Sequence, residues 1–133
     1  MELQVGVKVL LTNKKGEFLL LKRSEKYAGV GGMWDIPGGR ITPGTTLIKN
    51  LAREIKEETG LTLGKEVTLL GAQDILRVPG RHVVRLTYEA RAKGEVALSD
   101  EHVAFKWVSL EDLRRTRGLD AYLRALLKKW QTH

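Results

Sequence analysis

Residues 53–60 of this 133-residue chain read Arg53-Glu54-Ile55-Lys56-Glu57-Glu58-Thr59-Gly60, and this stretch places three carboxylates within five positions. The apolar spacing around it predicts an amphipathic helix from Thr46 to Thr59. At about 100° per residue, one arc of the helix is apolar and carries Leu47, Ile48, Leu51, Ala52 and Ile55. A neighbouring arc carries the three glutamates, so the helix has one packing face and one acidic face.

The acidic face is unfavourable in local terms. Glu54 and Glu58 form an i,i+4 pair of like charge, and the last turns of a helix favour cations over anions. Two local rules broken at one place usually indicate function. Clustered carboxylates become favourable when a hard cation such as Mg²⁺ lies among them. The alternative is a solvated acidic face with Arg53 and Lys56 as ion-pair partners.

A glycine corner precedes the helix, in the run Trp34-Asp35-Ile36-Pro37-Gly38-Gly39-Arg40. The stretch from Gly39 to Leu61 resembles the signature of the Nudix hydrolase superfamily: Gly, five residues, Glu, seven residues, then Arg-Glu-apolar-x-Glu-Glu-x-Gly-apolar. The positions that fit are Gly39, Arg53, Glu54, Ile55, Glu57, Glu58, Gly60 and Leu61. The resemblance extends along the chain and implies an α/β class fold, a Nudix-type α/β/α sandwich with a mixed β-sheet between helices.

One position departs from the signature. Its first glutamate would fall at residue 45, where this chain has Thr45. In the family that glutamate mainly supports the metal site and the geometry of the loop and helix, while the later glutamates hold the metals. The change therefore bears on efficiency, or on a second or third metal ion, more than on the basic chemistry.

The resemblance also implies roles for the clustered residues. The Gly38 carbonyl, Glu57 and Glu58 are expected metal ligands, and Glu54 is expected to be a metal ligand or the general base. Arg53 is expected to orient the carboxylates, and its alternative role is a weak ion pair on the helix surface.

A further carboxylate is expected from outside the helix. The run Ser99-Asp100-Glu101-His102 resembles the loop that supplies a late metal-binding or general-base glutamate in many Nudix enzymes. Glu101 is the favoured residue, Asp100 is its rival, and a solvated loop is the alternative for both. His102 is another candidate base, although a lone loop histidine usually has no such role.

Three residues are candidates for substrate binding. Arg23 ends a predicted strand and Arg40 follows the glycine corner, and both suit a diphosphate. A plain surface arginine is the alternative for each. Trp34 either stacks on a base or packs the loop, and packing is favoured.

Length, composition and charge agree with one globular domain over residues 1–133. Hydrophobic residues make up 42% and charged residues 29%, and the absence of cysteine excludes thiol catalysis and cysteine-ligated metal sites. No signal peptide or membrane span is recognisable, so the expected location is cytoplasmic. The net charge of +7 suggests an anionic partner. Nucleic acid is only weakly supported as that partner, and nothing excludes a homodimer.

The remaining pattern predicts short strands around the central helix. Strands are expected over residues 3–11, 18–22, 82–92 and 104–108, and one or two more, broken near Gly71, over residues 67–78. A glycine-rich loop is expected over residues 24–33. A short helix starting at Ser109 and a helix over residues 120–130 complete the chain.

The resemblance to the Nudix hydrolases implies a pyrophosphohydrolase that uses Mg²⁺, with Mn²⁺ as a substitute, on a nucleoside diphosphate linked to another group. The corner sequence slightly favours a nucleoside triphosphate or related nucleotide, and ADP-ribose or another nucleotide sugar is the alternative substrate. The alternative function is a non-catalytic Nudix-fold domain that binds a nucleotide or RNA, which Thr45 and the basic charge motivate.

Overall fold

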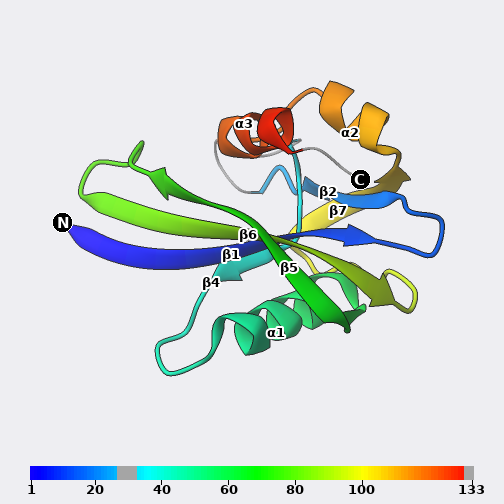
Figure 1. Cartoon of the computed structure of the whole chain (residues 1–133), viewed down its shortest axis with the longest axis horizontal. Helices are drawn as coiled ribbons and strands as arrows, with labels where there is room; N and C mark the ends of the chain where they lie inside the picture. The colour runs from blue at the N-terminus through cyan, green and yellow to red at the C-terminus, as the bar shows by residue number, and fades with distance from the viewer. Residues whose placement is uncertain (27–32, 131–133) are drawn as a thin grey trace.

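A mixed β-sheet lies between helices in the computed structural model, which describes residues 1–26 and 33–130 (Figure 1). The sheet contains seven strands among these residues: β1 (Glu2–Thr12), β2 (Phe18–Arg23), β3 (Trp34–Asp35), β4 (Gly38–Arg40), β5 (Thr62–Ile75), β6 (Arg81–Lys93) and β7 (His102–Val108). β1 runs parallel to β6 and antiparallel to β2 and β4. Helix α1 (Leu47–Thr59) lies on one side, and α2 (Leu110–Arg115) and α3 (Ala121–Lys129) on the other. The predicted α/β/α sandwich is confirmed.

Strand β1 divides the core because alternate residues of a strand face opposite sides of the sheet. Val7, Val9 and Leu11 are buried against Leu51 and Ile55 of α1. On the opposite side, the second buried cluster joins the sheet to α2 and α3 and contains Leu10, Phe18, Leu20, Ile36, Leu113, Leu119, Leu123 and Leu127. The apolar stripe of the last helix therefore packs into the core, as its spacing predicts.

Helix α1 has the boundaries that its sequence predicts. The Thr46 hydroxyl accepts a hydrogen bond from the Lys49 N–H at 3.2 Å, which caps the first turn. At the other end Gly60 has a φ of 74° and donates its N–H to the Lys56 carbonyl at 3.0 Å. Left-handed backbone at this position favours glycine, which explains the abrupt end of the helix.

Strand β5 differs most from its prediction. It is one continuous strand that begins at Thr62, five residues before the predicted start at 67, and ends at Ile75. Its pairing with β6 shifts register between Leu63 and Val67 and again between Leu69 and Gly71. The predicted break near Gly71 is therefore a bulge, because an extra residue bends a strand without ending it.

The other predictions of secondary structure hold within one or two residues. Ser109 and Asp120 cap α2 and α3 with their side chains. Of the predicted glycine-rich loop, residues 27–32 lie outside the described residues. In the part of the chain that the structure describes, no helix has the length and apolar character to cross a membrane.

Candidate active site

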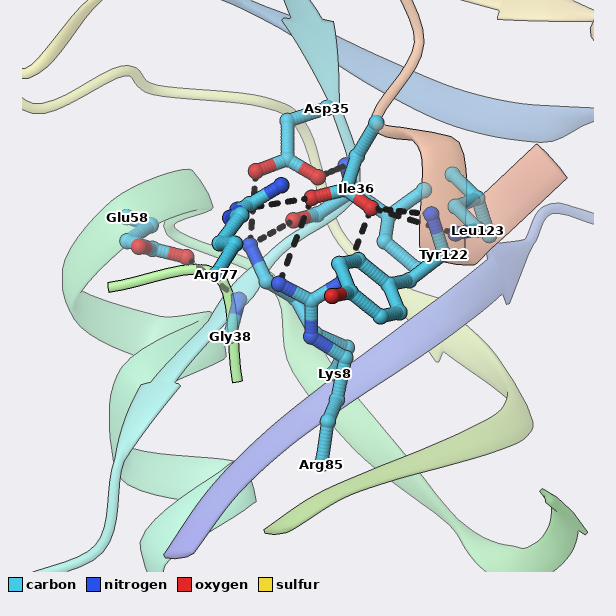
Figure 2. Close-up of polar contacts among 10 residues, drawn as sticks. Lys8, Asp35, Ile36, Gly38, Glu58, Arg77, Arg85, Tyr122 and Leu123 are labelled. Atoms are coloured by element: carbon cyan, nitrogen blue, oxygen red, sulfur yellow. Dashed lines mark hydrogen bonds and ion pairs between the residues drawn. The ribbon is translucent and has the colours of Figure 1, made fainter. Parts of the chain in front are cut away.

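A cleft of about 1130 Å³ is lined by residues of α1, β1, β4 and β6, the connection between β5 and β6, and the start of α3. Carboxylates of α1 lie at its glycine corner, and arginines line other parts of its wall. Figure 2 shows Glu58 beside Gly38, with Lys8 and Asp35 nearby. The cleft therefore brings together the signature residues of the helix and the corner.

Glu58 is bound to the backbone of the glycine corner. Its side chain is 7% exposed, and its Oε2 accepts a hydrogen bond from the Gly38 N–H at 2.9 Å. Gly38 has a φ of 151°, and a Cβ built there would lie 2.0 Å from the Val7 carbonyl oxygen. Only glycine fits this position, so the corner and the buried carboxylate depend on each other.

Glu54 packs against the next residue of the corner. A Cβ built on Gly39 would lie 2.8 Å from the carboxyl carbon of Glu54. The absence of a side chain at Gly39 therefore lets the helix carboxylate touch the strand backbone. Two consecutive glycines thus place β4 directly against the acidic face of α1.

Burial raises the pKa of both carboxyls. It raises the pKa of Glu58 to about 7, an effect that the charges of Glu54 and Glu101 increase and that the Gly38 hydrogen bond and Lys8 oppose. Burial also raises the pKa of Glu54, and Arg53 opposes this shift. Both shifts therefore come mainly from burial, which the nearby positive charges of Arg53 and Lys8 offset only in part.

Arg53 and Glu57 form an ion pair on the helix surface. The Arg53 Nη1 donates to both Glu57 oxygens at 3.2 Å, and its Nη2 donates to Glu54 Oε1 at 3.2 Å. The Glu57 side chain is 58% exposed and does not line the cleft. The structure therefore places Arg53 between two of the predicted ligands, and holds Glu57 outside the cleft.

Glu101 lines the cleft and its rival Asp100 does not. The charge of Glu101 raises the pKa of both Glu54 and Glu58, which places it near the helix carboxylates. His102 is buried instead. Burial and the charge of Arg23 lower its pKa, so the ring is neutral at pH 7.

The chemistry of these donors fits a hard divalent cation, since carboxylate oxygens are the ligands that such ions prefer. Glu54, Glu58 and Glu101 line one cleft, and the raised pKa of Glu58 reflects its unfavourable negative charge there. Across residues 1–26 and 33–130, no three acidic or histidine side chains already converge as a metal site.

The three predicted substrate-binding residues all line the cleft. Arg23 is paired in register with His102, beside Glu101. Arg40 is exposed; partial burial and the charges of Arg81 and Arg85 lower its pKa, and the charge of Glu2 opposes this shift. Trp34 packs against the cluster of α2 and α3, and the Lys106 ammonium lies 4.3 Å from its ring centroid. Packing is thus observed for Trp34, and its stacking on a base stays a prediction.

Thr45 lies away from the cleft, in the loop before α1. Its N–H donates to the Thr42 carbonyl at 3.0 Å, and it does not line the cleft wall. The same loop is tied to the helix by Asn50, which is fully buried and accepts from the Thr42 N–H and from Arg53 at 3.0 Å each. Sequence reasoning missed Asn50, although a polar residue on the packing side of the helix was a usable signal.

Lys8 and Asp35 were also missed. The Lys8 ammonium donates to Asp35 Oδ2 at 2.7 Å and to the Ile36 carbonyl at 3.2 Å (Figure 2). Both Lys8 and Asp35 line the cleft. The signal was a lysine within an otherwise apolar strand. Such a residue indicates either an exposed position or a buried ion pair, and only the structure distinguishes them.

Asp120 joins the start of α3 to the sheet. Its carboxylate lies 3.2 Å from Arg85 Nη1 and 3.3 Å from Arg77 Nη2, and it accepts from the N–H groups of Tyr122 and Leu123 at 2.7 and 3.2 Å. These hydrogen bonds and charges lower the pKa of Asp120 although burial opposes them. Figure 2 shows both arginines beside the Tyr122 ring. This cluster fixes one wall of the cleft.

Comparisons with known proteins agree with this geometry. A family model described as NUDIX domain matches residues 2–129. The nucleoside triphosphatase NudI of Escherichia coli is 32% identical over 113 residues, which cover 77% of this chain and 80% of NudI. The mouse 8-oxo-dGDP phosphatase NUDT18 is 33% identical over 90 residues, or 68% of this chain and 26% of that longer protein.

Solved structures extend the similarity to the whole fold. The crystal structure of a MutT NUDIX hydrolase from Burkholderia pseudomallei superposes with a TM-score of 0.83 at 32% identity. The match covers 98% of this chain and 100% of that one. With a family match over nearly its whole length, and with the glycine corner and carboxylate helix in place, the chain belongs to the Nudix hydrolases, which act on pyrophosphate bonds.

Proposed function

We propose that this protein is a Mg²⁺-dependent pyrophosphohydrolase of a nucleoside triphosphate or a related nucleotide. The observation that carries the proposal is the gathering of Glu54, Glu58 and Glu101 around the glycine corner of a cleft whose walls also carry arginines. The clustered carboxylates can bind a divalent cation, and the arginines can bind the oxygens of a polyphosphate. The negative charge of a nucleoside phosphate would be attracted by both the bound cation and the arginines.

The relatives support this substrate class. NudI is named a nucleoside triphosphatase and NUDT18 an 8-oxo-dGDP phosphatase. Both names describe nucleotides with a phosphoric anhydride. ADP-ribose or another nucleotide sugar stays the alternative substrate, and a homodimer, nucleic-acid binding and a cytoplasmic location stay predictions.

Each site residue has a defined part in the proposed reaction. Glu54, Glu58, Glu101 and the Gly38 carbonyl would hold the cation, joined by Glu57 once it leaves its ion pair with Arg53. When bound, Mg²⁺, or Mn²⁺ in its place, would neutralise the diphosphate and lower the pKa of an attacking water. Glu54 or Glu101 would take the proton of that water. Arg23 would contact the diphosphate from the side of Glu101.

The reaction needs positioned charge rather than a nucleophilic side chain. Phosphoryl transfer depends mainly on alignment and on charge neutralisation. The hydrogen bond from Gly38 holds Glu58 in place, and the contacts from Arg53 hold Glu54. These contacts therefore hold the carboxylates of Glu54 and Glu58 in position before the substrate binds.

A nucleotide screen tests the proposal. Release of phosphate or pyrophosphate is measured from nucleoside triphosphates, nucleoside diphosphates and ADP-ribose, with Mg²⁺ and with a chelator. We expect turnover of at least one nucleoside phosphate that stops when the cation is removed. If nucleotides bind but none is hydrolysed at saturating Mg²⁺ or Mn²⁺, the non-catalytic binding function replaces this proposal.

A further inference from the structure

Four arginines line the cleft on the side of the sheet that faces α3: Arg40, Arg77, Arg81 and Arg85. Asp120 neutralises part of this charge, because it forms ion pairs with Arg77 and Arg85. Among the described residues, no carboxylate forms an ion pair with Arg40 or Arg81. In the part of the chain that the structure describes, these two arginines therefore form no ion pair, and Glu2, in register with Arg81, is the carboxylate whose charge acts on Arg40.

The strand register defines where these arginines stand. Arg40 of β4 and Arg85 of β6 are both paired in register with Gly6 of β1. Residues paired across neighbouring strands project from the same face of the sheet. Gly6 has no side chain, so the sheet surface between Arg40 and Arg85 is left open.

Arg81 lies further from the glycine corner along the same face. It is paired with Glu2, whereas Gly38 of the corner is paired with Lys8, six residues along β1. At about 3.3 Å per residue, the Arg81–Glu2 pair and the Gly38–Lys8 pair are roughly 20 Å apart along β1. Ile75 and Val83 form apolar floor between them. This separation leaves room for a nucleoside between the corner and Arg81.

Arg40 lines the same cleft as Arg81 and Arg85. Burial lowers its pKa, and so do the charges of Arg81 and Arg85, while Glu2 acts in the opposite direction. The strand register places Arg40 and Arg81 on the same face of the sheet, and both line the cleft.

The geometry points to a second anion subsite in this cleft, in which Arg40 and Arg81 bind a phosphate ester on the ribose of the nucleotide. The preferred substrate would thus carry a 3′- or 2′-phosphate in addition to the diphosphate that is cleaved. Guanidinium groups suit a phosphate because their donors form paired hydrogen bonds with its oxygens. The inference rests on the proposed function for the orientation of the nucleotide, with its diphosphate at the glycine corner.

Binding of ligands without an anhydride bond tests the subsite apart from catalysis. Calorimetry with Mg²⁺ compares adenosine 5′-monophosphate with adenosine 3′,5′-bisphosphate and adenosine 2′,5′-bisphosphate, and the guanosine ligands are compared in the same way. We expect one bisphosphate to bind at least about tenfold more tightly than the monophosphate, as one charge-assisted contact would give. The tighter isomer identifies the ribose position.

Variants assign the effect to the two arginines. In Arg40→Gln and in Arg81→Gln the affinity ratio between bisphosphate and monophosphate should fall to about two or less. The matched control is Arg91→Gln, an exposed arginine of β6 outside the cleft, which should keep the full ratio. Circular dichroism shows whether each variant is folded.

The outcomes separate this inference from the proposed function. Equal affinity for mono- and bisphosphates in the unmodified protein overturns the subsite, and so does a ratio that survives both cleft substitutions. Absence of hydrolysis with every nucleotide overturns the proposed function alone, because the affinity ratio does not depend on turnover. A preference for bisphosphates that disappears in both variants supports the subsite in either case.

Discussion

Glu58 and Gly38 are twenty residues apart in the chain, and one hydrogen bond of 2.9 Å joins them in the cleft. The carboxylate belongs to α1 and the N–H to β4, so the contact fixes the helix against the strand that follows the corner. A charge-assisted hydrogen bond of this kind is stronger than one between neutral groups. Burial nevertheless dominates, since the pKa of Glu58 is raised to about 7. The site therefore contains a buried carboxylate whose negative charge a bound cation would stabilise.

Removing the helix carboxylates should impair catalysis without unfolding the protein. We expect Glu58→Gln and Glu57→Gln each to lower kcat at least about a hundredfold, because each removes a charge that would hold the metal. Steady-state turnover with Mg²⁺ measures this, with the exposed Glu66→Gln of β5 as the control. Turnover close to that of the unmodified protein in both variants would contradict the metal-site assignment. Glu57 is the sharper test because it now faces Arg53.

The loop carboxylate is tested by a pair of neighbouring substitutions. Glu101 lines the cleft and Asp100 does not, so Glu101→Gln should lower the rate strongly while Asp100→Asn has little effect. The reverse result would move the role to Asp100. Little change in either variant would mean that the chemistry depends on the helix alone.

Thr45→Glu tests the departure from the family signature. An added carboxylate near a dication should tighten Mg²⁺ binding, because more ligand charge lowers the dissociation constant. We expect a lower Mg²⁺ requirement and a higher kcat, both obtained from turnover as a function of Mg²⁺ concentration. Thr45 does not line the cleft, so an unchanged Mg²⁺ requirement would mean that the loop has adapted to threonine.

Stability of the metal-free protein should depend on pH through Glu58. The unfolded pKa is near 4.5 and the folded pKa about 7, so between these values the folded state binds more protons than the unfolded state. Stability from this group is therefore greatest at low pH and falls as pH rises from about 4.5 to 7, by up to about 3 kcal/mol. Urea unfolding in chelator at pH 5 and pH 8 measures the change. Glu58→Gln should remove this part of the pH dependence, and an unchanged slope would contradict the burial argument.

Asp120 should make stability depend on pH in the opposite direction to Glu58. Its pKa is lowered below 3.8 mainly by Arg85 and by backbone hydrogen bonds, against the effect of burial. Its stabilisation is thus complete above the unfolded pKa of 3.8 and is lost as pH falls through the folded value. We expect Asp120→Asn to cost roughly 2 kcal/mol at pH 7. The exposed Asp100→Asn should cost much less, and equal costs would show that the ion pairs with Arg77 and Arg85 contribute little.

Local features explain why parts of the fold were predictable. The bounds of α1 follow from its apolar spacing, from the Thr46 hydroxyl and from the left-handed Gly60, which all act within one helix. The corner at Gly38 and Gly39 was predictable from the signature. The break expected near Gly71 was wrong because pairing with β6 continues through a bulge, and a propensity pattern does not contain the partner strand.

The sequence by itself determined the family, the central helix and the carboxylates available to a metal, because these depend on residue type and on spacing along one element. Tertiary structure alone decided that Glu57 lies outside the cleft and that Glu101, rather than Asp100, lines it. It also placed Arg40 and Arg81 on one face of the sheet, since their positions depend on how β4 and β6 pair with β1. A shift of one residue in that pairing would turn these side chains to the other face of the sheet. No pattern within a single strand specifies that register.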